Sequence, residues 1–199
     1  MEEVRKSHNL VKRHLIQKVV GKGNTPVLVL DVGCGFGGDL KKWFSIDRHL
    51  QLDMCDPNGE SLKEAQQRVK NLKLEKHRIK FFNGDIFSCP LKQYDFICYN
   101  FSLHYIFESP SFFFKSLNEI IKRLKPGGKL FGCIPDSEQI LLKTPFRDTL
   151  GNYFARNDER TGFGNFGEKV FVFLSDTPYY EDGPKPEPIA YKDMLITHL

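Results

Sequence analysis

The chain has 199 residues, of which 40% are hydrophobic and 27% charged, with a formal net charge of +4 at pH 7. This composition is typical of a soluble globular protein with a substantial core, and no apolar run approaches the ~20 residues of a membrane span. The five cysteines form no C-x-x-C pair, which argues against a zinc site or a disulfide framework and favours a reduced, intracellular protein.

The first predicted element is a helix over residues 2–20. Its apolar residues approximate one face, with Arg and Lys elsewhere, and it lacks the apolar core of a signal sequence. The stretch Gly21–Pro26 ends the helix and leads into the first strand. Because the helix belongs to no repeat of strand and helix, we expect it to pack beside the glycine-rich turn that follows.

The stretch VLVLDVGCGFGGDL, residues 27–40, predicts a buried parallel strand, a glycine-rich turn and the start of a helix that reaches about Phe44. The positive end of that helix points at the turn. Four glycines in the turn allow a ligand to lie against the main chain: Gly33, Gly35, Gly37 and Gly38. The first, second and fourth also match the dinucleotide-binding pattern, which alone is a weak signal.

Two carboxylates discriminate between the candidate ligands. Asp31 stands at the mouth of the strand, and Asp39 is expected in the first turn of the helix. Both would repel a pyrophosphate, and both would attract a ligand that carries an ammonium and a sulfonium group. The pattern therefore favours S-adenosylmethionine over NAD. The alternative is a nucleotide fold in which Asp39 only complements the helix dipole and Asp31 only forms a turn.

Strands and helices then alternate along the chain. Strands are predicted at 50–56, 79–82, 94–99 and 129–134, and helices at 61–74, 112–124 and near 138–142. Residues 125–128, KPGG, predict a sharp turn, and Pro135–Ser137 a helix cap. Five alternations predict an α/β fold with a doubly wound, mostly parallel sheet. Ligands of such sheets bind beyond the carboxyl ends of the strands.

The pattern changes from Gly151 onward. Residues 152–156 and 169–174 alternate like antiparallel strands and predict a small lid or hairpin. Three prolines around Glu187 predict a stiff extended stretch, and residues 189–199 predict a helix.

Two further acids follow predicted strands. Asp56 closes the second strand, roughly 20 residues after the glycine turn, where an acid can accept both hydroxyls of a ribose. Its alternative role is to form a turn before Pro57. Asp85 follows the third strand, where it is placed for the edge of an adenine; alternatively, it forms an Asx-turn after Gly84.

The loop Asn100–Ser109 follows the fourth strand and is a substrate loop by its position. His104 can hydrogen-bond a substrate, His104 and Tyr105 offer flat faces to a base, and Tyr105 can face a sulfonium. Phe101 and Phe107 fit better as core residues.

Four segments resemble the mRNA cap guanine-N7 methyltransferases, a family of class I S-adenosylmethionine-dependent methyltransferases: DVGCGFGGDLKKW, FSLHYIFES, KPGGKLFGCIPDSE and the N-terminal HNLVK. Their order and spacing match across nearly the whole chain. The glycine motif and the KPGG turn occur in many class I methyltransferases, whereas HNLVK and the HYxFES loop are far narrower signals. The resemblance implies a Rossmann-like fold with a small antiparallel insertion on the cap side.

It also implies one methyltransferase domain over residues 1–199. Within it we expect an N-terminal helix over the donor site (1–20), a donor-binding core (26–150) and a lid or cap-binding segment (151–199). The chain ends inside the helix after Glu187, so we expect the last strands of the family to be absent from it.

The resemblance assigns residue roles. Lys12 would reach the methionine carboxylate of S-adenosylmethionine, Asp56 would hold the ribose and Asp85 the adenine. The donor-binding set is Lys12, Asp31, Gly33, Gly35, Asp39, Asp56, Asp85, Asn100 and Tyr105. The cap-binding set is His8, Asn9, His104 and Glu187. Without the resemblance, Glu187 would be interpreted as a solvated charge in a linker.

The chain departs from the family pattern at Phe36, where members usually carry a basic residue that meets the cap phosphates. Lys41 or Lys42 is the expected replacement, and the alternative is weaker binding of the cap phosphates. The N-terminal segment has His8-Asn9 in place of an asparagine-rich start.

The implied reaction is methyl transfer from S-adenosylmethionine to N7 of the terminal guanine of an mRNA cap. It uses no metal and no acid or base; instead, His104, Tyr105 and Glu187 position the reactants. Alternatives are a methyltransferase of another RNA or a small molecule, a non-catalytic methyltransferase-like subunit, or an NAD enzyme. The expected partners are capped RNA, other capping-enzyme domains or an activating subunit, and no membrane. The expected location is the nucleus, or the cytoplasm for a viral protein.

Overall fold

The computed structural model describes residues 3–156 and 165–199. The chain divides into two compact units. The parallel-sheet unit comprises Asn9–Ser102 and Asn118–Cys133, and the antiparallel-sheet unit comprises Met1–His8, Leu103–Leu117 and Ile134–Leu199. The single domain with its three segments stays a prediction. Within the described residues, no helix combines the length and the apolar character that crossing a bilayer requires.

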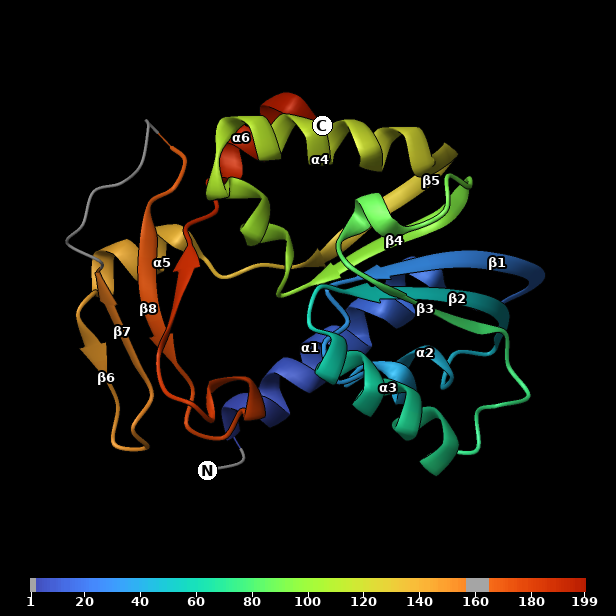
Figure 1. Cartoon of the computed structure of the whole chain (residues 1–199), viewed down its shortest axis with the longest axis horizontal. Coiled ribbons are helices and arrows are strands. Elements are labelled where there is room, and N and C mark those ends of the chain that lie inside the picture. The colour runs from blue at the N-terminus through green and yellow to red at the C-terminus, as the bar shows by residue number, and fades with distance from the viewer. Residues whose placement is uncertain (1–2, 157–164) are drawn as a thin grey trace. The chain divides into compact units, whose positions relative to one another are not determined.

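All five strands of the parallel-sheet unit run in the same direction, in the order β3-β2-β1-β4-β5 (Figure 1). They are β1 (Gly23–Val32), β2 (Arg48–Asp56), β3 (Ile79–Asn83), β4 (Tyr94–Asn100) and β5 (Leu124–Cys133). Because β1 pairs with β2 on one side and with β4 on the other, the switch point lies at its carboxyl end. The predicted doubly wound parallel sheet is confirmed, and Asp31 lies at the position where such sheets bind ligands.

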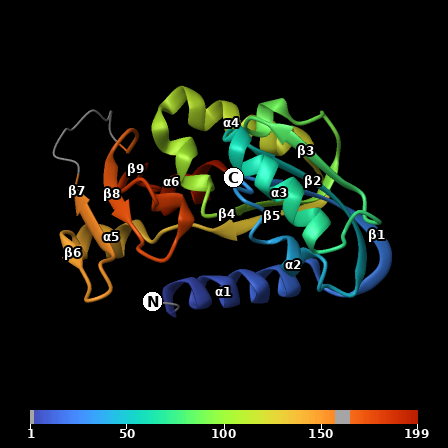
Figure 2. The same cartoon turned by 60° about the horizontal axis from the view of Figure 1, so that its bottom comes forward.

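Helices cover both faces of this sheet. The part of α1 (Glu3–Val20) that belongs to this unit lies on one face with α2 (Leu40–Trp43) and α3 (Gly59–Asn71), and the corresponding part of α4 (Pro110–Arg123) lies on the other (Figures 1 and 2). Asn58 fixes the start of α3, because its side chain accepts hydrogen bonds from the N–H groups of Glu60 and Ser61.

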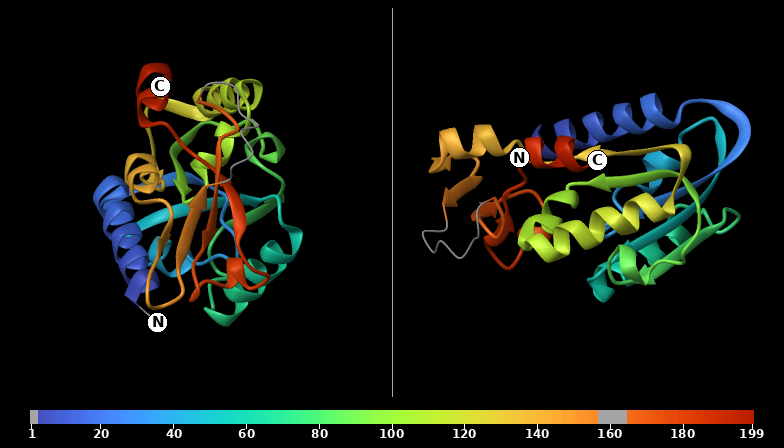
Figure 3. Two further views of the ribbon diagram at one scale, coloured as in Figure 1. Left: turned by 90° about the vertical axis from the view of Figure 1, so that its left-hand side faces the viewer. Right: turned by 90° about the horizontal axis from the view of Figure 1, so that it is seen from above.

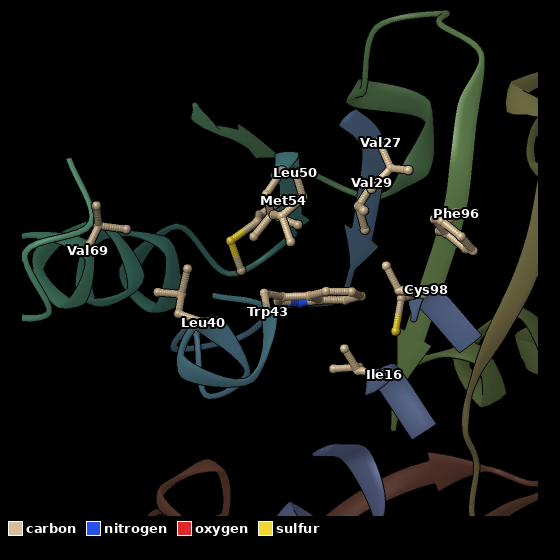
Figure 4. Packing of buried hydrophobic residues seen from close by; sticks show 12 residues of the cluster. Ile16, Val27, Val29, Leu40, Trp43, Leu50, Met54, Val69, Phe96 and Cys98 are labelled. Atoms are coloured by element: carbon tan, nitrogen blue, oxygen red, sulfur yellow. The ribbon is translucent and has the colours of Figure 1, made fainter. Parts of the chain in front are cut away.

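The main core of this unit lies between the sheet and the first three helices. Trp43 of α2 is fully buried and packs with Ile16 of α1, Met54 of β2 and Cys98 of β4 (Figure 4). A buried aliphatic or aromatic side chain of this kind contributes roughly 1.5–3 kcal/mol. The apolar residues of the predicted first strand are therefore buried in this core, as the sequence pattern predicts.

Two local predictions are wrong. Asp39, expected in the first turn of the helix that follows the glycine turn, precedes α2 without capping it through its side chain, since residues 35–39 form turns. Gly37 and the residues before it adopt turn conformations that a regular helix cannot contain. Residues 125–128, predicted as a sharp turn, belong to β5, whose pairing with β4 is irregular between Tyr94 and Phe96.

The antiparallel-sheet unit contains four strands in the order β6-β7-β8-β9, which follow one another in the sheet as in the sequence. They are β6 (Phe146–Arg147), β7 (Tyr153–Arg156), β8 (Lys169–Phe173) and β9 (Lys185–Pro188). Figure 3 shows these orange and red strands side by side. The predicted pairing of residues 152–156 with 169–174 is confirmed; residues 157–164 between them lie outside the described residues.

The antiparallel-sheet unit also contains short helices. They are the 3₁₀ turns η2 (Leu103–Glu108) and η3 (Pro178–Tyr180), and the α-helices α5 (Ser137–Lys143) and α6 (Lys192–His198). Asp136 caps α5 as predicted, because its side chain accepts from the N–H of Gln139. The proline-rich stretch around Glu187 is an edge strand rather than a linker, a position that tolerates residues without an N–H donor.

Candidate functional site

The four glycines of the turn divide into two kinds. A Cβ at Gly33 would lie 2.3 Å from the Cβ of Ser102, and one at Gly37 would lie 3.0 Å from the Cβ of Ala65. These two positions, both at positive φ, are required by packing within the protein. By contrast, a Cβ at Gly35 or Gly38 would meet nothing within 4 Å. The absent side chains of Gly35 and Gly38 therefore leave room beside the backbone.

Asp31 is buried at the carboxyl end of β1 and accepts a hydrogen bond from the indole Nε1 of Trp43 at 2.8 Å. Burial, and then the charge of Asp39, raises the pKa of Asp31 to about 7, against the lowering effects of Trp43 and the nearby lysines. A cation beside this carboxyl would lower its pKa and favour the charged form.

Asp39 has the opposite character. Its Oδ1 lies 2.8 Å from Nζ of Lys12 and 2.7 Å from Nζ of Lys42, and its Oδ2 accepts from Nδ2 of Asn100 at 2.9 Å. Burial favours the neutral form, but the two lysines outweigh it and hold the pKa of Asp39 below its ordinary value. Asp39 is therefore an anion that already has its counter-charges.

Asn100 lies at the end of β4, next to β1 in the sheet. Its side-chain Oδ1 is buried and accepts no hydrogen bond from any described residue. A buried acceptor without a partner is costly, and a ligand N–H group would satisfy it.

Asp56, at the end of β2, accepts two backbone hydrogen bonds, from Gly35 N at 2.7 Å and from Asn58 N at 2.9 Å. Each carboxylate oxygen keeps a further lone pair for a hydroxyl. Asp85 accepts from the N–H of Phe87, which is the Asx-turn that the sequence left open as an alternative. The structure therefore shows a local role for both acids.

The donor-side residues of the parallel-sheet unit fit the group that the sequence motif implies. A ligand with amino-acid and ribose groups and a positive charge would need three things that this region offers. They are open space at Gly35 and Gly38, an unpaired acceptor on Asn100, and the carboxyl of Asp31, which a cation would favour in its charged form.

In the antiparallel-sheet unit, the structure brings two predicted cap-binding residues together. Nε2 of His104, in η2, lies 3.1 Å from Oε2 of Glu187, in β9, and both residues are buried. The other oxygen of Glu187 accepts a hydrogen bond from the hydroxyl of Tyr180. Neither ring nitrogen of His104 makes a hydrogen bond of regular geometry with a described residue, so Nε2 and Oε2 of Glu187 are in close contact without one. Glu187 is therefore not the solvated charge that its sequence context alone suggests.

Tyr105 extends this group toward the surface. Its ring lies 4.3 Å from the ring of His104, and its hydroxyl is 2.7 Å from that of Tyr179. Burial, and then the charge of Glu187, raises the pKa of Tyr105 well above its ordinary value, so its hydroxyl stays protonated. Nζ of Lys185 lies 4.6 Å from the ring centroid of Tyr179.

The remaining predicted residues lie on α1 and α2. His8 and Asn9 are adjacent and half-buried on α1. Of the two lysines proposed to replace a basic residue at Phe36, Lys42 is 4% exposed and committed to Asp39 and to the carbonyl of Gly38, whereas Lys41 is exposed. Lys41 is therefore the better candidate.

Sequence reasoning missed three residues that shape these sites: Trp43, Ser102 and Tyr180. Trp43 carried one available signal, since a buried indole N–H needs an acceptor and an acid precedes it in the same motif. Tyr180 carried none, because its partner Glu187 is fixed by strand pairing.

The fold is that of the Rossmann-like methyltransferases. The PH0226 protein from Pyrococcus horikoshii OT3 superposes with a TM-score of 0.68 over all of this chain and 81% of its own, at 16% identity. Phosphoethanolamine N-methyltransferase 2 from Haemonchus contortus, solved with S-adenosyl-L-methionine, gives a TM-score of 0.50 over 62% of this chain and 27% of its own, at 25% identity.

The family model for the mRNA (guanine-N(7))-methyltransferase domain matches residues 1–177, and the chain belongs to this family. The mRNA cap guanine-N(7) methyltransferase of Eremothecium gossypii is 32% identical over 90% of this chain and 42% of its own length. That of Schizosaccharomyces pombe is 32% identical over 87% and 53%, respectively. The chain thus spans about half the length of these relatives.

Proposed function

We propose that this chain transfers a methyl group from S-adenosylmethionine to N7 of the terminal guanine of a 5′-capped RNA. The observation that carries the proposal is the buried pair of His104 and Glu187, which are far apart in sequence and adjacent in the antiparallel-sheet unit. A buried carboxylate is a costly feature that a purine with adjacent N–H donors would justify. Family membership supports the same substrate, since the relatives are named for it.

The donor-side residues have separate tasks in this proposal. Bound S-adenosylmethionine supplies a methyl group on a sulfonium, which is already a good leaving group. Asp56 accepts the ribose hydroxyls, Asn100 and Asp31 face the cationic groups, and Lys12 holds the carboxylate. Asp85 is assigned to the adenine, through a carboxylate that also closes its own turn. Gly33 lies at the methionine end, and the open space at Gly35 allows the ligand to come close to the main chain.

The acceptor-side residues hold the purine. His104 and Tyr105 present ring faces and hydrogen-bonding groups, Glu187 accepts from the N–H edge of guanine, and His8 and Asn9 meet the cap. N7 has a free lone pair at neutral pH, so no residue has to remove a proton. Catalysis is then positioning of two ligands, a contribution that in model reactions reaches roughly 7–11 kcal/mol.

The partners and the location extend the proposal. Capped RNA is the partner that the family name implies. Other capping-enzyme domains or an activating subunit, and a nuclear location, are further expectations for the whole protein.

The decisive experiment measures methylation of GpppG-capped and uncapped RNA, with His104→Ala as the test variant. We expect activity on capped RNA alone, and a loss in the variant of at least 10-fold in kcat/KM for cap, about 1.4 kcal/mol. Affinity for S-adenosylhomocysteine, measured by calorimetry, should not change in that variant. Equal methylation of uncapped RNA, or equal loss of donor and cap affinity, would contradict the proposal.

A further inference from the structure

Glu187 is a buried carboxylate, and its charge has to be stabilised by other residues of the antiparallel-sheet unit. It is 6% exposed on the edge strand β9, opposite Val170 of β8. Burying a carboxylate costs several kcal/mol unless charged or polar partners compensate it. The partners that the structure gives it are the imidazole of His104 and the hydroxyl of Tyr180.

Tyr180 is a rigid partner. It is 6% exposed at the end of η3 and packs with Val170, Val172 and Ile189. Its ring meets the ring of Phe173 edge-on at 6.3 Å. Burial, and then the charge of Glu187, raises the pKa of Tyr180 well above its ordinary value, so the phenol donates at any working pH.

We propose that Tyr180 is the positioning residue that orients Glu187 for guanine, and that it sets the preference of the site for guanine over purines that lack the 2-amino group. The hydroxyl occupies one side of Oε1, which stops the carboxylate from rotating about its last bond. The remaining lone pairs then face one direction, as two adjacent N–H donors of guanine require. This inference rests on the proposed function, which supplies the guanine.

The chain contains a matched control. Tyr191 also donates its hydroxyl to a glutamate, Glu168, which lies just beyond the end of the β8–β9 pair, where its carbonyl accepts from the N–H of Ile189. Tyr191→Phe therefore removes the same atom from the same kind of pair without touching Glu187.

The experiment compares GpppA-capped RNA with IpppA-capped RNA, in which inosine lacks the 2-amino group. Wild type should prefer guanine. Tyr180→Phe should raise KM for the GpppA cap about 10-fold, the loss expected for a hydrogen bond to a charged group. Its kcat should be nearly unchanged, and it should show little preference for the GpppA cap over the IpppA cap. Tyr191→Phe should keep the wild-type preference.

A double-mutant cycle provides the second readout. In a Glu187→Gln background, Tyr180→Phe should change cap affinity by less than about 2-fold, because the anion that the phenol orients is gone. Tyr180→Phe with full guanine preference, or equal losses in Tyr180→Phe and Tyr191→Phe, would overturn the inference and leave the proposed function intact. A wild-type chain that does not methylate caps would instead overturn the proposed function, and the inference with it.

Discussion

Asp56 and Glu187 are two buried acids that the molecule holds by different means. Asp56, in the parallel-sheet unit, accepts from two backbone N–H groups of the turns that surround it. Glu187, in the antiparallel-sheet unit, is held by side chains, the phenol of Tyr180 and the imidazole of His104. Backbone N–H groups cannot be substituted, so the geometry around Asp56 comes with the fold. The side chains that contact Glu187 can be exchanged, so the surroundings of this carboxylate can change while the fold stays.

The largest expected effect comes from substituting glycines of the turn whose backbone contacts Asp56. Gly33→Ala should lower the free energy of unfolding by about 3 kcal/mol or more, from a positive φ and from the overlap with Ser102. Gly35→Ala, at positive φ but facing open space, should cost about 1–2 kcal/mol in stability and should still abolish donor binding. Urea unfolding and calorimetry with S-adenosylhomocysteine separate the two.

Rescue sharpens that result. Ser102→Gly should restore part of the stability lost in Gly33→Ala, because it removes the Cβ that would lie 2.3 Å away. If the double variant is no more stable than Gly33→Ala, the overlap is not the cause.

The next effect concerns the raised pKa of Asp31. In the folded protein the group binds a proton that the unfolded chain has already released between pH 4 and 7. Its contribution to stability is therefore fully present below about pH 4 and is lost as the pH rises through about 7. Asp31→Asn should flatten the fall of unfolding free energy with pH by about 1 kcal/mol per pH unit over this window.

Comparing Asp31→Asn with wild type at each pH cancels the titration of all other groups, and the asparagine still offers Trp43 an acceptor. Parallel stability curves for the two proteins between pH 4 and 8 would show that Asp31 keeps its ordinary pKa.

A smaller effect tests the side-chain contacts within the parallel-sheet unit. Lys12→Met should weaken binding of S-adenosylhomocysteine about 10-fold, near 1.4 kcal/mol. Stability should change little, since Asp39 keeps Lys42 and Asn100. Arg13→Met, an exposed charge removed one residue further along α1, is the control and should bind as wild type does. Equal weakening in both variants would indicate a general effect of charge.

The smallest effect belongs to an exposed pair of the antiparallel-sheet unit. Nζ of Lys169 lies 2.6 Å from Oε1 of Glu108, whose side chain is half exposed. Lys169→Gln should change the unfolding free energy by less than about 0.5 kcal/mol. A decrease in unfolding free energy several times larger would mean that exposed side-chain pairs contribute strongly to the stability of the antiparallel-sheet unit.

The same difference explains how much the sequence could predict. The strand ends that carry Asp31, Asp56 and Asn100 follow from apolar runs and from the order of strands, so their gathering at one edge of the sheet was predictable. The place of Asp39 just before α2 was not, because the motif does not fix the residue at which the turns of residues 35–39 end and the helix begins. The contact of Glu187 with His104 depends on the register of strands between residues that are far apart in the sequence. Only the family resemblance, which assigns both residues to the cap, placed them together.

Trp43 is the single tryptophan of the chain, and its indole N–H is hydrogen-bonded to the carboxyl of Asp31. Indole emission is sensitive to a charge beside the ring nitrogen, so Trp43 is an intrinsic fluorescent reporter of the carboxyl end of β1. A fluorescence titration of the unlabelled chain should follow the protonation of Asp31 without any added dye.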